Sequence, residues 1–215
     1  MSSTAHPALQ HHFDDLEQQA EASTLGMWMF LVTEIMFFGG LFLAYLLYRL
    51  WHPDAFREGS HHLDITLGAV NTAVLILSSL TMALAVRAAQ IGRRMATVYL
   101  LVATMALGCV FLGIKAVEYG DKFEHHLVPG PNFFVDSPNA PAVQMFYSLY
   151  FAMTGLHALH MVIGVGLMLV ITWMAFRGKF SPEYYVPVEV SGLYWHFVDI
   201  VWIFLFPLLY LIGRH

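Results

Sequence analysis

The chain has 215 residues, of which 58% are hydrophobic and 12% are charged. Soluble domains carry about 25% charged residues, so this composition excludes an ordinary soluble enzyme and indicates a membrane protein. The formal net charge of −5 at pH 7 offers no basic surface for nucleic acid, and the single cysteine, Cys109, excludes a disulfide framework or a thiolate metal cluster.

The first 24 residues are polar and acidic, without the positively charged start or the apolar core of a cleavable signal peptide. We assign residues 1–24 to an N-terminal tail, which is either a short amphipathic helix or a disordered acidic arm. Residues 25–215 are assigned to a single membrane domain.

Five apolar stretches follow, and each reaches the roughly 20 residues that a helix needs to cross a bilayer. The predicted spans are about 25–49, 66–88, 94–119, 142–176 and 186–213. Their hydrophobicity is continuous, which excludes the alternating pattern of barrel strands, and backbone groups in lipid must be satisfied within a helix. The expected fold is therefore an all-α membrane bundle of five transmembrane helices.

The connections between the spans are short, and none is long enough to hold a soluble domain. The longest, residues 122–141, contains four prolines and one glycine, which favour turns. Small residues at helical spacing, where neighbouring helices approach closely, occur at Ala69 and Ala73 and at Ser79 and Ala83. Glycines 39, 40, 108, 155, 164 and 166 are further candidates for close helix contacts. Pro207 is expected to bend the last helix.

Orientation does not follow from the number of basic residues, since five Lys or Arg residues fall on each side of the membrane. One of the two sets is concentrated in short loops, and it consists of Arg87, Arg93, Arg94, Arg177 and Lys179. A concentration of basic residues in short loops favours the cytoplasmic side, which would place the N-terminus in the cytoplasm.

Glu34 is the clearest polar group inside a predicted span. It lies in "MFLVTEIMFFGG", and no Lys or Arg of that helix is within one turn. A lone carboxyl in hydrocarbon is costly unless it is paired, protonated or hydrated. We therefore identify Glu34 as a proton-supply candidate, and the alternative is a permanently protonated acid that hydrogen-bonds a neighbouring helix.

Other polar groups occur in the last three spans. His196 and Asp199 are three residues apart in "LYWHFVDIVW" and can face the same way, as a relay, half of a metal site or an interhelical hydrogen-bond knot. Lys115 and Glu118 are close enough to pair where the third span ends, and Glu189 lies at the start of the fifth span. We expect these end-of-span charges to be interfacial.

His157 and His160 lie three residues apart in "TGLHALHMVIG". One helix cannot supply both axial ligands of a haem from this spacing, so a haem would have to pair one of them with His196. A di-metal carboxylate site would need Glu-x-x-His units, which the spans lack. We favour structural hydrogen bonding for this pair, with a haem as the alternative.

Three stretches together resemble subunit III of the haem–copper terminal oxidases. They are "LVTEIMFFGGLFLAYL", "FAMTGLHALHMVIG" and "YWHFVDIVWIFLFPLLYL", in the first, fourth and fifth spans. Their order and spacing and the five-span layout also fit. The resemblance runs from about Leu25 to the C-terminus and is to the shorter, five-helix form, which lacks two N-terminal helices of longer members.

This resemblance implies a non-redox subunit without a cofactor or a catalytic centre of its own. Haem and copper are then expected in the partner subunits I and II, and the chain would pack beside subunit I. It would hold phospholipids in a V-shaped cleft between its first two helices and the rest, and it would support sustained turnover by aiding proton supply and protecting the active site. The resemblance also implies a cytoplasmic N-terminus.

The same resemblance assigns individual residues. Glu34 matches the family's intramembrane glutamate and is the proton-supply candidate. A structural polar network falls on the family's motif positions His157, His160, Glu118, Glu189, His196 and Asp199.

The function expected from this resemblance is that of subunit III of an aa3-type cytochrome c oxidase in a bacterial inner membrane. The nearest alternatives are subunit III of a quinol oxidase and the related accessory subunit of nitric oxide reductases. A membrane cytochrome b is an alternative of a different class, and the absence of inverted repeats disfavours a transporter. We expect the 122–141 connection to contact cytochrome c or another respiratory complex on the outer face.

Overall fold

The computed structural model describes residues 9–131 and 133–211. Its elements are α1 (Leu16–Trp51), α2 (Pro53–His61), α3 (Ile65–Gln90), α4 (Arg94–Glu124), α5 (Ala140–Phe176), α6 (Val186–Phe206) and the π-helical turn η1 (Pro207–Leu211). Within these described ranges there is no strand, and five helices are long and apolar enough to cross a membrane. The predicted all-α fold with five transmembrane helices is confirmed.

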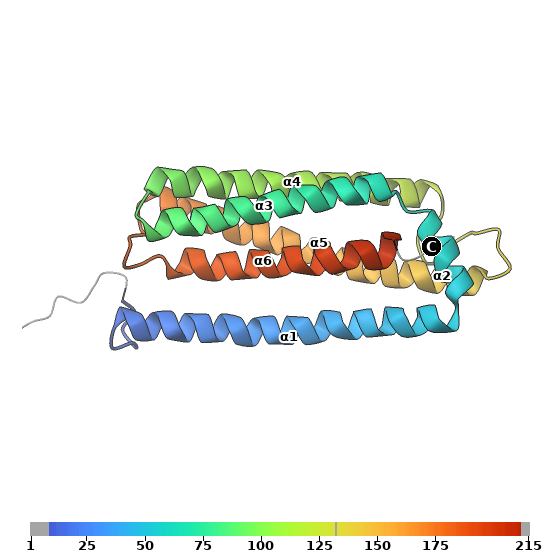
Figure 1. Ribbon diagram of the computed structural model, residues 1–215, viewed down its shortest axis with the longest axis horizontal. Helices are drawn as coiled ribbons and strands as arrows, with labels where there is room; N and C mark the ends of the chain where they lie inside the picture. Colours follow the sequence, from blue (N-terminus) through green and yellow to red (C-terminus); the bar gives the residue numbers. More distant parts are fainter. Residues whose placement is uncertain (1–8, 132, 212–215) are drawn as a thin grey trace, which may run out of the picture.

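The long helices lie side by side, and α2 covers one end of the bundle near η1 (Figure 1). Helix α6 lies between α1 on one side and α3 on the other, α4 packs mainly against α3, and α5 packs against both α4 and α6. The α3–α4 and α5–α6 connections lie at the end of the bundle where α1 begins (Figure 1). The predicted V-shaped cleft and cytoplasmic N-terminus remain predictions.

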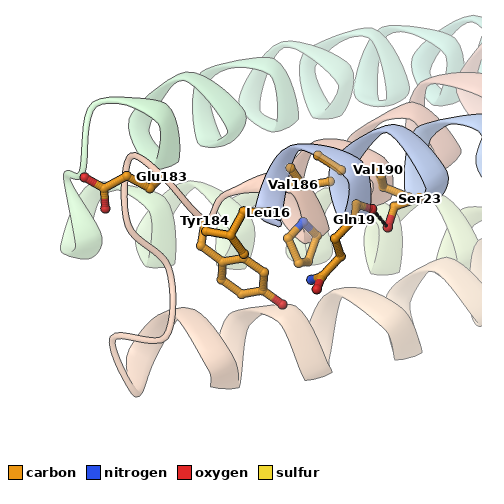
Figure 2. A pocket seen from close by; sticks show the side chains of 9 residues that line it. Leu16, Gln19, Ser23, Glu183, Tyr184, Val186 and Val190 are labelled. Carbon is orange, nitrogen blue, oxygen red and sulfur yellow. Dashed lines mark hydrogen bonds between the residues drawn. The ribbon is translucent and has the colours of Figure 1, made fainter. Parts of the chain in front are cut away.

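Helix α1 begins at Leu16, nine residues before the predicted span. Asp15 caps it by accepting a hydrogen bond from the backbone N–H of Gln18 at 2.8 Å, as an N-terminal carboxylate does well. Residues 16–24, which we assigned to the tail, are therefore the first turns of this helix. At 1.5 Å per residue α1 is about 54 Å long, against a hydrocarbon layer of about 30 Å. Its start and the start of α6 line a cavity of about 180 Å³ (Figure 2).

Two tryptophans of α6 fasten the centre of the bundle. Trp195 and Trp202 are completely buried and donate their indole N–H groups to hydroxyls of α3, at 2.8 Å from Ser78 and 3.1 Å from Thr72. Trp195 fits because Gly108 leaves room for it, since a Cβ there would lie 2.8 Å from its Cη2 atom. The predicted close contact is thus confirmed at Gly108.

The other predicted glycine contacts have different outcomes. Gly164 also lies against Trp195, where a Cβ would come within 3.1 Å, whereas a Cβ at Gly155 would make only an ordinary contact. A Cβ at Gly39, Gly40 or Gly166 would meet nothing within 4 Å. The prediction of close packing at these last three positions is wrong within the isolated chain.

Pro207 changes the type of helix. The α-helix ends at Phe206, and the π-helical turn η1 follows it directly from Pro207 to Leu211. Since proline has no N–H to continue the α-helical bonding pattern, the wider turn follows it. The Tyr45 hydroxyl of α1 donates to the Leu208 carbonyl of this turn at 2.9 Å.

Candidate functional site

A carboxyl and an imidazole from two different helices meet about halfway along the length of the bundle. Glu34 Oε2 of α1 lies 3.1 Å from His160 Nε2 of α5. Their side chains are 18% and 12% exposed, respectively. Glu34 is about 27 Å from the start of α1 and about 26 Å from its end, so this Glu34–His160 pair is deep in the membrane.

The hydrogen bond of the other His160 ring nitrogen determines which hydrogen bonds Nε2 can form with Glu34. His160 Nδ1 lies 2.9 Å from the Leu156 carbonyl oxygen, which accepts hydrogen bonds only, so Nδ1 carries a proton. Nε2 then accepts from a protonated Glu34, or donates to the Glu34 carboxylate when the ring is charged. A hydrogen bond between the two side chains therefore needs one proton, either on the Glu34 oxygen or on Nε2.

His157 lies on a different side of α5 from this pair. It is 1% exposed, with its ring centroid 5.3 Å from that of Phe111 and 5.2 Å from that of Trp202. Neither of its ring nitrogens forms a direct hydrogen bond within the described chain. The two histidines of "TGLHALHMVIG" therefore have different contacts: His157 packs against aromatic rings, and His160 bonds Glu34.

Lys115 and Glu118 form the second polar group, at the end of α4. Lys115 Nζ lies 2.8 Å from Glu118 Oε2, which confirms that they pair. The side chains are only 4% and 2% exposed, so the pair is buried within the bundle, and its place at the membrane interface stays a prediction. Residues of α5 and of η1 cover the pair and make it part of the core.

Two tyrosines complete this polar group. Glu118 Oε1 accepts from the Tyr150 hydroxyl at 2.8 Å and from the Tyr210 hydroxyl at 2.5 Å. Lys115 Nζ also lies 3.2 Å and 3.0 Å from these two hydroxyls. We call Lys115, Glu118, Tyr150 and Tyr210 the inner cluster; it joins α4, α5 and η1.

The aromatic rings around Lys115 offset part of the free-energy cost of burying its positive charge. The ammonium lies 5.0 Å from the Trp202 ring centroid and 5.2 Å from that of Tyr150, with Tyr119 and Tyr210 within 5.7 Å. Aromatic faces attract a cation, most strongly where water is excluded. The sequence reasoning missed Tyr150 and Tyr210, since nothing in their spacing links them to α4.

The remaining predicted residues are on α6. His196 Nδ1 is 2.7 Å from the Ser79 hydroxyl of α3. Asp199 is 2% exposed, and neither of its carboxyl oxygens makes a regular hydrogen bond within the described residues. Glu189 is half-buried in the first turn of α6. The predicted polar residues thus lie in several separate places.

Two grooves flank α6. One, between α1 and α6, has a volume of about 460 Å³ and is lined mostly by apolar and aromatic side chains, including Trp28, Phe38, Phe197 and Phe204. The other, between α3 and α6, also has about 460 Å³ and contains Ser79, His196 and Asp199. No group of three or more His, Cys, Asp or Glu side chains among the described residues is arranged to hold a metal ion.

The sequence model of the family described as cytochrome c oxidase subunit III matches residues 15–214. A cytochrome c oxidase subunit 3 of Thermostichus vulcanus is 34% identical, over 94% of this chain and 92% of that one. The corresponding subunit of Synechocystis is 36% identical, over 87% and 74% of the two chains. A cytochrome bo(3) ubiquinol oxidase subunit 3 of Pseudomonas aeruginosa is 29% identical, over 94% and 91%.

Proposed function

This chain belongs to the cytochrome c oxidase subunit III family, and on that premise we propose that it is the non-redox subunit of an aa3-type cytochrome c oxidase in a bacterial inner membrane. In this role it packs beside subunit I, while haem and copper reside in subunits I and II. It sustains O2 reduction and proton pumping without carrying the reaction itself. The Glu34–His160 pair is the observation that most directly supports a part in proton supply.

Proton supply follows from the chemistry of this pair. A group that feeds protons to a neighbouring subunit must bind a proton, release it and be reachable by water or by another polar group. A hydrogen bond joins the Glu34 carboxyl to the His160 ring, and each of these groups is able to bind a proton. Both side chains are also partly exposed. Glu118 differs, because it is only 2% exposed and its two oxygens accept three hydrogen bonds from buried partners.

Phospholipid binding has its best support in the groove between α1 and α6. Its volume of about 460 Å³ and its lining of Phe, Trp, Ile and Leu side chains suit an acyl chain, which forms contacts by dispersion and needs no hydrogen bonds. We propose that one or two lipid tails occupy this groove and support the position of α1.

The electron donor is the finer part of the proposal. The relatives include cytochrome c oxidase subunits at 34–36% identity and a ubiquinol oxidase subunit at 29%, so a quinol oxidase is the second candidate. Purification of the intact complex and assay with reduced cytochrome c and with a quinol separates the two. We expect oxidation of cytochrome c; oxidation of the quinol alone would favour the second candidate.

A Glu34→Ala variant tests the role in proton supply. We expect normal assembly and a normal haem spectrum of the complex, with turnover that is slower or that stops after fewer cycles. Thr33→Ala is the matched control, because Thr33 is the exposed neighbour whose hydroxyl, among the described residues, bonds only the Phe30 carbonyl of its own helix. A Glu34→Ala complex that turns over as long as the Thr33→Ala complex would exclude this role.

A Soret band in the purified chain, freed of other subunits, would contradict the proposal in a different way. Such a band would mean that the chain binds haem and would favour a membrane cytochrome b. The outer 122–141 connection remains a predicted contact for cytochrome c or another respiratory complex.

A further inference from the structure

The groove between α3 and α6 is lined by both apolar and polar side chains. It opens to the side of the bundle, and its walls include the exposed apolar side chains Leu80 and Ile203. The same groove contains Asp199 and His196 of α6 and Ser79 of α3. This groove on the membrane-facing surface therefore contains polar side chains, although its outer walls are apolar.

The carboxyl of Asp199 has an incomplete set of hydrogen bonds among the described residues. The side chain is 2% exposed, and both carboxyl oxygens are buried without a regular hydrogen bond in the described chain. Ser79 is beside the carboxyl and its hydroxyl is also bonded to His196 Nδ1 at 2.7 Å, so its one O–H group can serve at most one of the two Asp199 oxygens. An unsatisfied polar group in hydrocarbon is costly, so a neighbouring molecule is expected to provide the missing bond.

The depth of Asp199 restricts what that molecule is. The residue lies about 20 Å along the helix axis from Val186 and about 18 Å from Leu211. Phospholipid headgroups lie at the two surfaces of the membrane, and acyl chains have no hydrogen-bond donors. A side chain on another transmembrane helix reaches this depth and can offer a donor.

The α3 wall of the groove has the shape that such a helix needs. Ser79 and Ala83 are four residues apart and both line the groove, so two small side chains follow one another on one face of α3. Small residues at this spacing let the backbones of two membrane helices approach closely. The groove between α1 and α6 differs, since large aromatic side chains form its walls.

We propose that the α3–α6 groove receives a transmembrane helix of another subunit of the oxidase complex, and that this helix presents a hydrogen-bond donor to Asp199. His196 and Ser79 hold the floor of the groove in place through their mutual bond. The inference rests on the proposed function only in requiring that the chain is part of an oxidase assembly.

Photo-cross-linking in the intact complex tests the proposal. A p-benzoylphenylalanine is placed at Leu80, which lines the groove and is 54% exposed, and in a matched control at Val110 of α4, which is 48% exposed and outside the groove. We expect the Leu80 probe to cross-link a transmembrane segment of another oxidase subunit, with a Ser, Thr, Asn, Gln, Lys or Arg side chain at the depth of Asp199. The Val110 probe should not cross-link that segment.

Every other outcome of the cross-linking overturns the proposal. Cross-links from Leu80 only to phospholipid, to a quinone or to a second copy of this chain would each identify a different occupant, and no cross-link in an active complex would mean an empty groove. In all these cases the chain still co-purifies with the oxidase, so the proposed function stands. A chain that never co-purifies with oxidase subunits would instead refute the proposed function.

Substitution of Asp199 gives a second readout that does not depend on a probe. Asp199→Leu removes the interhelical bond, and we expect the chain to dissociate from the purified complex about 3- to 18-fold more readily. Asp199→Asn keeps an acceptor and should stay close to the wild type. Equal retention of the Leu and wild-type chains at equal membrane levels would contradict the proposal; if the Leu variant does not accumulate in the membrane, the Leu80 cross-link decides.

Discussion

Glu34 and Glu118 are both carboxyl groups inside a membrane bundle, but their surroundings differ. Glu118 is 2% exposed and accepts hydrogen bonds from one ammonium and two tyrosine hydroxyls. Glu34 is 18% exposed, and His160 is its one hydrogen-bond partner among the described side chains. Glu118 is held by residues of α4, α5 and η1, whereas Glu34 joins only α1 to α5.

This difference is the basis on which we propose a structural role for Glu118 and a proton-supply role for Glu34. A charge that is fully paired inside the core cannot change its protonation without disrupting several bonds at once, so the inner cluster is suited to holding helices together. A carboxyl with one titratable partner and partial exposure can exchange a proton at little structural cost. Burial of a carboxyl is therefore not enough to identify a proton carrier, and the number of its partners is decisive.

The largest effect is expected when one half of the inner cluster is removed. Glu118→Ala leaves the Lys115 ammonium buried and unpaired, which should lower the free energy of unfolding by about 3–5 kcal/mol. Unfolding in mixed detergent micelles measures this change. The double variant Lys115→Met, Glu118→Gln removes both charges and should recover at least half of the loss, whereas additive losses would contradict pairing.

Removal of one bond from the same cluster should cost less. Tyr210→Phe deletes the hydroxyl that donates to Glu118 at 2.5 Å and leaves the ring in place. We expect a loss of about 1–3 kcal/mol, because a buried acceptor loses a partner. Tyr99→Phe, at an exposed tyrosine of α4, is the control and should leave stability unchanged in the same unfolding experiment.

His157 should depend on shape rather than on hydrogen bonds. His157→Phe keeps a ring between Phe111 and Trp202 and removes two nitrogens that have no direct partner in the described part of the chain. The expected change is below about 1.5 kcal/mol. His157→Ala leaves a cavity and should cost more, about 2–5 kcal/mol. A loss from the Phe variant as large as that from the Ala variant would show that the ring nitrogens are bonded after all.

The smallest change in stability is expected at Glu34. Glu34→Gln keeps a hydrogen-bonding side chain opposite His160 but cannot release a proton. We expect its unfolding free energy to remain within about 1 kcal/mol of the wild type, as for a single hydrogen bond between two membrane helices. A loss comparable to that of Glu118→Ala would mean that both carboxyls are structural and would remove the contrast between them.

The sequence predicts the membrane bundle well because continuous apolar runs of about 20 residues have few other uses. It also identifies Glu34, since a lone carboxyl in such a run is conspicuous. It does not show that the first helix begins as early as Leu16, because residues 16–24 are polar and the helix continues beyond the hydrocarbon. Capping by Asp15 is the local signal that marks this earlier start.

The partners of the polar residues do not follow from the sequence. Glu34 meets His160 across 126 positions, and Glu118 meets Tyr210 across 92. Such pairings depend on how each helix is rotated in the bundle, and nearly uniform hydrophobicity leaves that rotation undefined. The spacing of His157 and His160 likewise suggested a common role, but a difference of three residues is enough to direct one ring into the core and the other toward α1.

Infrared difference spectroscopy of the intact oxidase tests the central claim most directly, because it detects the carboxyl C=O band of a protonated side chain during a redox cycle. If Glu34 supplies protons, the wild-type complex shows a carboxyl band that changes between the oxidised and reduced states and disappears in Glu34→Gln. Glu118→Gln, studied together with Lys115→Met to preserve the fold, should leave this band in place. A difference spectrum that Glu34→Gln does not alter would contradict the account.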